Sequence, residues 1–308
     1  MPRMDSKRQV TKDMKKDILR IIEENMDGFS KGQRQIARFL LEHYDRAAYM
    51  TAARLGHEVS VSESTVVRFV IELGFAGYPE FQKALQELIR TRLTSFQRVE
   101  VTNQLIGDGD LLEKVLMGDV EKIRRTLEGI SDEVFYGAVD ALVKAKRIYI
   151  IGVRSSATLA GFLNYNLRMV LDHVRLIETT SGSELFEQIM DIEPGDIMVA
   201  ISFPRYSKRV INAVSFAKGA GAQVLALTDS ADSPIAAEAD HVLVAQSDMA
   251  SFADSMVAPM SIINALLVAI SRAKAEDVNL RLRRLEEIWD KYDVYDKSSS
   301  APSSGRKV

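Results

Sequence analysis

The chain has 308 residues and a formal net charge of −3, and 46% of its residues are hydrophobic, which is typical of globular proteins with room for two domains. It contains no cysteine, which excludes disulfides, thiolate zinc sites and a cysteine nucleophile. The N-terminus has no apolar segment of the secretory type, and no apolar run reaches the roughly 18 residues of a membrane span, so we expect a cytoplasmic protein without a membrane partner.

The first 93 residues are predicted to form an all-helical domain. Apolar residues recur at helical spacing from 13 to 26. Two short helices, 51–57 and 62–73, are then separated by a tight connection, which is the pattern of a helix-turn-helix. A further helix follows at 79–93. We therefore assign residues 1–93 to a helix-turn-helix DNA-binding domain.

The second helix of this pair begins with small polar side chains. Hydroxyl groups at a helix start allow a close approach to the groove floor, and an arginine one turn later can reach a guanine or a phosphate. Residues 1–95 also hold 16 Lys and Arg against 13 Asp and Glu, whereas the rest of the chain is acidic. The alternative is an ordinary helical hairpin with a capped second helix. The residues predicted to bind double-stranded operator DNA are Ser62, Ser64, Thr65 and Arg68.

From residue 111 the pattern changes to that of an α/β domain. Short, β-branched apolar runs alternate with helical stretches long enough for crossovers between parallel strands. We therefore predict a three-layer α/β sandwich with a five-stranded parallel sheet over residues 111–296. A linker at 94–110 precedes it, and a disordered tail at 297–308 follows it. The predicted strands are 147–151, 174–177, 196–202, 223–228 and 241–244.

Hydroxyl-bearing loops follow the first and the third of these strands. A strand that runs through a loop into a helix start presents backbone N–H groups and a helix dipole, and serines there add donors for a phosphate. Because both loops leave the same edge of a parallel sheet, we expect them to meet at one crevice. A pair of ordinary helix caps is the alternative. The residues predicted to bind an anionic ligand are Arg154, Ser155, Ser156, Ser202, Arg205 and Ser207.

The two arginines in these loops leave two hypotheses open. A guanidinium can clamp a phosphate or carboxylate through two parallel hydrogen bonds, so Arg154 and Arg205 can adapt the site to a more negatively charged or differently shaped anion. Alternatively, both side chains point to solvent or pair with carboxylates such as Glu184 or Glu187.

Both parts of the chain resemble one family. Residues 13–93 resemble the N-terminal domain of the RpiR family of bacterial transcription regulators, which joins a helix-turn-helix to a sugar isomerase (SIS) domain. The pattern S-x-S-x-S-T-V-V-R-F-x-x-x-L-G-F-x-G-Y-x-E-F-Q, at 60–82, carries this resemblance. Residues 147–245 resemble the SIS domain, which binds phosphorylated sugars, and this implies a sugar-phosphate effector. The residues that the resemblance implies for the phosphate are Ser155, Ser156, Ser202 and Ser207.

The two loops depart from the family pattern. The first loop of the family usually reads G-x-G-x-S, and the second reads S-x-S-G-x-T. Here Arg154 stands in place of the second glycine of the first loop. In the second loop, Pro204 and Arg205 stand in place of Ser-Gly, and Ser207 replaces the threonine. One serine donor and two flexible glycines are therefore replaced, and two guanidinium groups are gained.

No motif in the sequence marks a catalytic group. Of the four histidines, two fall in the DNA-reading part and two flank predicted strands, while Glu178 and Glu184 are possible bases without a motif. We therefore predict no catalytic residue, metal or cofactor, and a ligand-controlled regulator rather than an enzyme. Paired half-sites need paired recognition helices, so we expect a homodimer or homotetramer. The alternatives are a sugar-phosphate isomerase or lyase with an accessory helical domain, and a scaffold that has lost its ligand.

Overall fold

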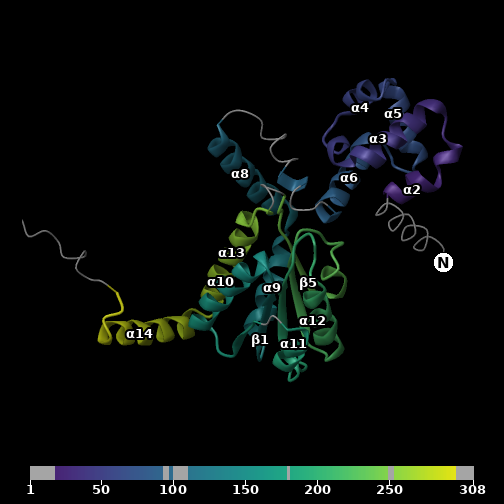
Figure 1. The fold of residues 1–308 in the computed structure, drawn as a ribbon. Helices are drawn as coiled ribbons and strands as arrows, with labels where there is room; N and C mark the ends of the chain where they lie inside the picture. Colours follow the sequence, from purple (N-terminus) through teal and green to yellow (C-terminus); the bar gives the residue numbers. More distant parts are fainter. Residues whose placement is uncertain (1–17, 93–96, 100–109, 179–180, 249–252, 296–308) are drawn as a thin grey trace, which may run out of the picture. The chain divides into compact units, whose positions relative to one another are not determined.

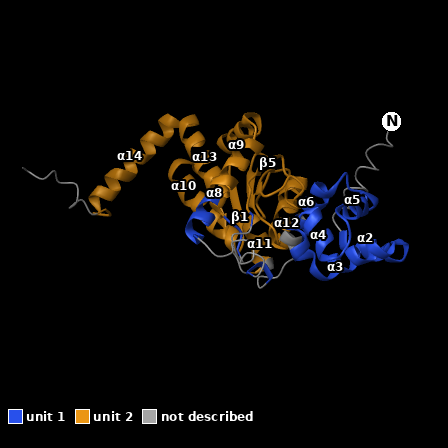
Figure 2. Ribbon diagram, turned by 90° about the horizontal axis from the view of Figure 1, so that it is seen from above, with its two compact units in different colours: residues 1–117, 248–255 blue, residues 118–247, 256–308 orange. Residues whose placement is uncertain are grey.

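The computed structural model divides the chain into two compact units. Unit 1 comprises residues 1–117 and 248–255, and unit 2 comprises residues 118–247 and 256–308 (Figure 2). The predicted tail at 297–308 and most of the predicted linker at 94–110 lie outside the described residues. The residues that the structure describes are 18–92, 97–99, 110–178, 181–248 and 253–295.

The described N-terminal part of unit 1 is helical, as predicted. Its helices surround a single apolar core, to which the recognition-type helix contributes Val66, Phe69 and Val70. Phe29 meets Phe69 edge to face, with ring centroids 5.1 Å apart. The part of the predicted helix at 13–17 lies outside the described residues. The elements are α2 (Ile18–Glu24), η1 (Met26–Gly28), α3 (Lys31–Ala47), α4 (Ala52–Glu58), α5 (Glu63–Glu72) and α6 (Tyr78–Arg92) (Figure 1).

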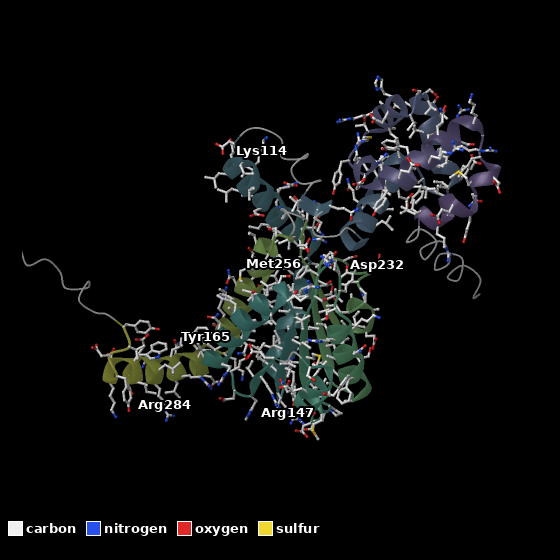
Figure 3. The ribbon with its side chains drawn as sticks, viewed as in Figure 1. Lys114, Arg147, Tyr165, Asp232, Met256 and Arg284 are labelled. Carbon is white, nitrogen blue, oxygen red and sulfur yellow. The ribbon has the colours of Figure 1, made fainter. Side chains whose placement is uncertain are left out.

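The core of unit 2 is a five-stranded parallel sheet in the order β2-β1-β3-β4-β5, which confirms the predicted fold class. The bounds of two strands differ from the prediction: the first runs from 148 to 152 instead of 147 to 151, and the third from 197 to 201 instead of 196 to 202. Arg147 and Asp196 therefore lie just outside the strands. The Arg147 Nε donates to both carboxylate oxygens of buried Asp196 at 3.1 Å. Arg147 is labelled in Figure 3. The strands are β1 (Ile148–Gly152), β2 (Val174–Ile177), β3 (Ile197–Ile201), β4 (Gln223–Thr228) and β5 (His241–Val244).

Helices cover both faces of this sheet, giving three layers (Figure 1). One apolar core joins the sheet to α9, α10 and α13, and a second joins the other face to α11 and α12. Among the described helices, no single one is long and apolar enough to cross a membrane. Only α13 and α14 taken together would have the necessary length and apolar composition, and these two helices are bent by 102° relative to each other. The bounds are α8 (Leu111–Gly129), α9 (Asp132–Lys144), α10 (Ser155–Val170), α11 (Gly182–Ile189), α12 (Lys208–Gly219), α13 (Val257–Ala273) and α14 (Ala275–Lys291).

Candidate functional site

The loops after β1 and β3 begin side by side. The two strands are neighbours, and Gly152 at the end of β1 is the register partner of Ile201 at the end of β3. Both loops lead directly into helices, α10 after β1 and α12 after β3. The carboxyl edge of the sheet therefore gathers two helix N-termini, whose free N–H groups favour an anion.

Glycine is required at the end of β1. A Cβ atom added at Gly152 would lie 2.5 Å from the backbone oxygen of Ser156, so the first turn of α10 packs directly on the strand end. This close approach fixes where α10 begins and turns the chain sharply at Val153 and Arg154. The sequence around residue 152 therefore determines the position of the helix start relative to the sheet.

The turn after Gly152 places Arg154 in an unusual backbone conformation. Arg154 has φ 57° and ψ −126°, and Arg205 in the other loop has φ 68°. Positive φ is favourable for glycine and costly for residues with a Cβ atom. These are the two positions where the sequence has arginine and the family pattern has glycine. Both loops therefore keep a backbone conformation that glycine adopts easily, while Arg154 and Arg205 add a guanidinium group at these positions.

The four predicted serines occupy different environments. Ser156 and Ser202 are buried, with 5% and 4% exposed, and Ser155 is exposed. Within the described part of the chain, no group forms a hydrogen bond with the hydroxyls of these three serines. Ser207 instead caps α12, because its Oγ accepts a hydrogen bond from the Arg209 backbone N–H at 3.3 Å. Ser207 is therefore a helix cap, as the alternative hypothesis expected. The hydroxyls of Ser155, Ser156 and Ser202 can still bind a ligand.

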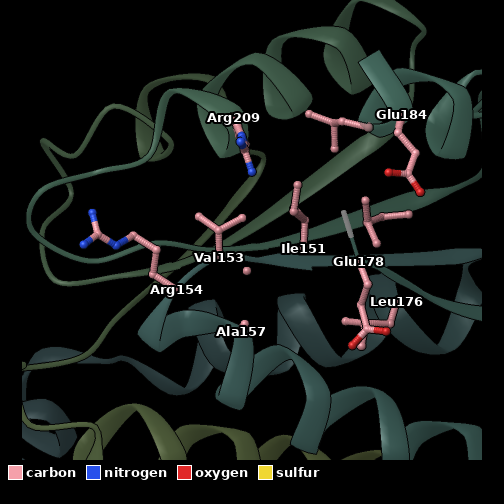
Figure 4. Close-up of a pocket in the computed structure, with 11 residues that line it drawn as sticks. Ile151, Val153, Arg154, Ala157, Leu176, Glu178, Glu184 and Arg209 are labelled. Atoms are coloured by element: carbon pink, nitrogen blue, oxygen red, sulfur yellow. The ribbon is translucent and has the colours of Figure 1, made fainter. Parts of the chain in front are cut away.

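A pocket of about 570 Å³ lies beside these loops (Figure 4). It is formed by the carboxyl ends of β1 and β2 and by side chains from α11 and α12. Of the six residues predicted to bind the ligand, Arg154 lines this pocket, and the five others do not. The lining residues are Ile151, Gly152, Val153, Arg154, Ala157, Leu176, Ile177, Glu178, Glu184, Leu185 and Arg209.

Charged side chains stand at opposite sides of the pocket. Figure 4 shows Arg154 and Arg209 toward one side and Glu178 and Glu184 toward the other. Sequence reasoning missed Arg209, although its position in the first turn of α12, two residues after the cap, was a usable signal. The apolar wall between the charged groups includes Ile151 and Leu185. Such a cavity suits a small polar molecule with an anionic end and hydroxyl groups at the other end.

The loop after β3 is also held from the next strand. The Tyr206 hydroxyl donates a hydrogen bond to Oδ1 of Asp229 at 2.8 Å, and the Thr228 hydroxyl donates to the same oxygen at 3.3 Å. Asp229 is 9% exposed and directly follows β4. Tyr206 lies between Arg205 and Ser207, so this hydrogen bond fixes the middle of the loop. No sequence motif around Tyr206 indicates that it anchors this loop.

The predicted DNA-reading residues lie at the start of α5. Ser62 is the cap of this helix, with its Oγ accepting from the Thr65 backbone N–H at 3.3 Å. The same Oγ lies 2.9 Å from the Ser64 Oγ and 2.8 Å from the Thr65 Oγ1. The Arg68 Nε donates to the Ser64 carbonyl at 3.3 Å, so the arginine folds back along the exposed face. Hydroxyls and a guanidinium therefore share one exposed face of α5.

The turn between α4 and α5 depends on another glycine. A Cβ atom at Gly56 would lie 2.8 Å from the carbonyl oxygen of Val61, which is closer than real side chains approach. The Val61 N–H in turn donates to the Gly56 carbonyl at 2.8 Å. This contact sets the two helices of the helix-turn-helix against each other and so positions the polar face of α5.

Comparison with known proteins assigns both parts of the chain. Residues 16–91 match the family described as a helix-turn-helix domain of the rpiR family, and residues 141–269 match the SIS domain. The regulator HexR of Pseudomonas aeruginosa is 24% identical over 281 residues, spanning 88% of this chain and 95% of HexR.

Solved structures show the same relationship. The sugar isomerase domain of an RpiR transcription factor from Sphaerobacter thermophilus is 31% identical, with a TM-score of 0.55; the match covers 58% of this chain and 99% of that one. The Vibrio vulnificus NanR protein, solved with ManNAc-6P, shares the fold at 23% identity and a TM-score of 0.57, covering 89% of this chain and 98% of NanR. This chain belongs to the RpiR family and is a helix-turn-helix transcriptional regulator with a SIS domain.

Proposed function

We propose that the SIS domain binds a phosphorylated sugar or a related anionic carbohydrate, and that binding changes the affinity of the helix-turn-helix for its operator. The observation that best supports this proposal is the register of β1 and β3. Because the two strands end side by side, the two hydroxyl-bearing loops that follow them begin at the same edge of the sheet. The phosphate is bound by Ser155, Ser156 and Ser202 together with the N-termini of α10 and α12. The complex of NanR with ManNAc-6P, in a protein of the same fold, supports this assignment.

The pocket accommodates the rest of the effector. Its volume of about 570 Å³ suits a hexose-sized molecule, and Glu178 and Glu184 can accept hydrogen bonds from sugar hydroxyls. Arg154 lines the pocket and forms no ion pair with Glu184 or Glu187 in the described structure. We assign it to an anionic group of the effector, as in the first hypothesis for the arginines. Arg205 is exposed at the neighbouring loop and is assigned the same role.

On the DNA side, Ser62, Ser64, Thr65 and Arg68 contact the operator. The hydroxyl-rich start of α5 enters the major groove, and Arg68 reaches a base or phosphate one turn later. A homodimer or homotetramer presents two such helices to two half-sites. The effector acts as a switch because it binds one arrangement of the protein more tightly than the other.

The test combines ligand binding with DNA binding. Thermal shift against a panel of sugar phosphates is expected to raise the melting temperature with at least one compound. Arg154→Ala is expected to weaken binding of that compound ~10-fold or more, because a charge-assisted hydrogen bond is worth ~1.5–3 kcal/mol. Arg284→Ala, on exposed α14, is the matched control and leaves the affinity unchanged. A gel shift with the DNA upstream of the gene, with and without the compound, measures the switch.

Two outcomes would contradict the proposal. If no phosphorylated sugar stabilises the chain while the upstream DNA is shifted, the effector is of another class. Turnover of the bound compound without a DNA shift would favour the alternative, a sugar-phosphate isomerase or lyase. The observation that favours this second function is that Glu178 and Glu184, two possible bases, line the pocket. Glu178→Gln then separates the two, because loss of turnover with retained binding identifies a base.

A further inference from the structure

The described residues that line the pocket include charged side chains of both signs and no neutral polar side chain. The positive groups are Arg154 and Arg209, the negative groups are Glu178 and Glu184, and the other lining residues are apolar or glycine. All of them belong to unit 2. The two signs are kept apart, because the arginines lie toward one side and the glutamates toward the other (Figure 4). A ligand that fills the pocket therefore meets a positive end and a negative end.

Helix α11 holds both glutamates at the negative end. Glu184 lies in the first turn of this helix, and the Gln188 Nε2 donates to the Glu178 carbonyl at 2.9 Å. Within the described part of the chain, no group forms a hydrogen bond or an ion pair with the Glu178 carboxylate. An acidic residue in the first turn of a helix is favoured by the helix dipole, which accounts for Glu184 alone. The dipole does not explain why a second carboxylate, that of Glu178, lines the same pocket.

A pair of carboxylates distinguishes between the groups that a sugar can present. Ionised carboxylates only accept hydrogen bonds. A hydroxyl or an acetamido group donates one hydrogen bond and carries no charge, so it leaves the two negative charges uncompensated. An ammonium group donates three hydrogen bonds and carries the opposite charge, and such charge-assisted bonds are roughly twice as strong as neutral ones. A second anionic group at this end would be repelled by both glutamates.

We propose that the effector is a phosphorylated amino sugar with a free amine, and that Glu178 and Glu184 bind its ammonium group. This inference rests on the proposed function, which supplies the binding of the phosphate. Arg154 and Arg209 then stand toward the anionic end of the ligand, so that the charges of pocket and ligand match end to end. The phosphate-binding loops make the same contacts with every sugar phosphate, and the two glutamates select among them.

The test compares compounds that differ at a single group. Titration calorimetry of the full chain uses glucosamine 6-phosphate, its N-acetyl derivative and glucose 6-phosphate, and the corresponding sets in the manno and galacto series. In at least one series the amine is expected to bind ~10-fold or more tightly than both other compounds, because it alone brings a positive charge to the carboxylates.

Variants of the glutamates locate the selectivity. Glu178→Gln and Glu184→Gln keep the size of the side chain and remove its charge. Each is expected to weaken binding of the amine ~10-fold and to change binding of the parent hexose phosphate less than about two-fold. Glu187→Gln is the matched control, because Glu187 is exposed on the same helix and does not line the pocket. It should leave every affinity unchanged.

The outcomes separate this inference from the proposed function. If a hexose phosphate or an N-acetyl derivative binds as tightly as the amine in every series, the inference is wrong and the proposed function stands. The inference is also wrong if a preference for the amine survives in both glutamate variants. If none of the sugar phosphates binds, the proposed function fails and this inference fails with it.

Discussion

Arg154 and Arg205 hold backbone conformations that glycine adopts most easily. Their φ values are 57° and 68°, and Arg154 combines its φ with ψ −126°, far from the ordinary left-handed helical region. Residues in such regions cost of order 1–3 kcal/mol each and persist where the surroundings or the function demand them. The close packing of Gly152 on α10 imposes the turn, and the anion assigned to the pocket explains why arginine stands there.

At the residue scale we predict that Arg154→Gly and Arg205→Gly each raise the free energy of unfolding by about 1 kcal/mol. Relief of the positive-φ strain exceeds the entropy that glycine adds to the unfolded chain. Urea denaturation measures the change. Ser155→Gly, at a helical position of α10, is the control and should lower stability by ~0.5–1 kcal/mol. If the two arginine variants lose as much stability as this control, the backbone of the two turns is not strained.

Helix α6 is anchored to the corner between α3 and α4. The Tyr78 hydroxyl and the Gln82 side-chain amide both donate to the Met50 carbonyl at 2.8 Å, and the Gln86 amide donates to the Ala48 carbonyl at 2.9 Å. Burial raises the pKa of Tyr78 to about 12. Because α5 packs between these elements in the same core, this anchor also holds the DNA-reading helix.

At the element scale, the pKa of Tyr78 predicts a loss of stability in alkali. Between pH ~10, where tyrosine in the unfolded chain ionises, and pH about 12, the folded protein keeps its phenol proton. The unfolded state then binds fewer protons, so the free energy of unfolding falls as pH rises through this window. Tyr78→Phe should lower stability by ~1 kcal/mol at pH 7, through the lost hydrogen bond, and make the alkaline fall shallower. If the free energy of unfolding fell equally steeply above pH 10 in the wild type and in Tyr78→Phe, the alkaline loss of stability would not come from Tyr78.

Across the whole molecule, one buried ion pair joins segments that are far apart in sequence. The Arg98 Nη1 donates to Oδ1 of Asp254 at 2.9 Å, and the two residues are 156 positions apart. Their side chains are only 2% and 9% exposed. Arg98 follows the helices of the DNA-reading part, whereas Asp254 lies in the chain between β5 and α13 of the SIS domain. The pair therefore ties together two stretches of unit 1 that the sequence separates widely.

At this scale we predict that Arg98→Met lowers the free energy of unfolding by ~3 kcal/mol or more, because it removes the positive charge that accompanies a buried carboxylate. The double variant Arg98→Met/Asp254→Leu should recover much of the loss. Arg124→Met, which removes an exposed pair with Glu121, is the control and should cost less than ~1 kcal/mol. Urea denaturation of the four proteins measures the differences. Equal effects of Arg98→Met and Arg124→Met would mean that the buried pair contributes no more than a surface one.

The sequence by itself determined the helical DNA-reading part, the five parallel strands and the family. Apolar periodicity and turn residues are local signals, so α5 with its Ser62 cap and the strands β2, β4 and β5 could be read directly. The meeting of the two hydroxyl-bearing loops also followed from the sequence, because parallel strands end at one edge of the sheet.

Only the tertiary structure decided which side chains line the pocket. Arg209 lines the pocket because α12 packs beside α11, and the fold also decided that Ser207 serves as a helix cap, which the sequence had left as one of two alternatives. Local spacing specifies elements, whereas side-chain neighbours depend on contacts between residues distant in the chain, and these exist only in the folded protein.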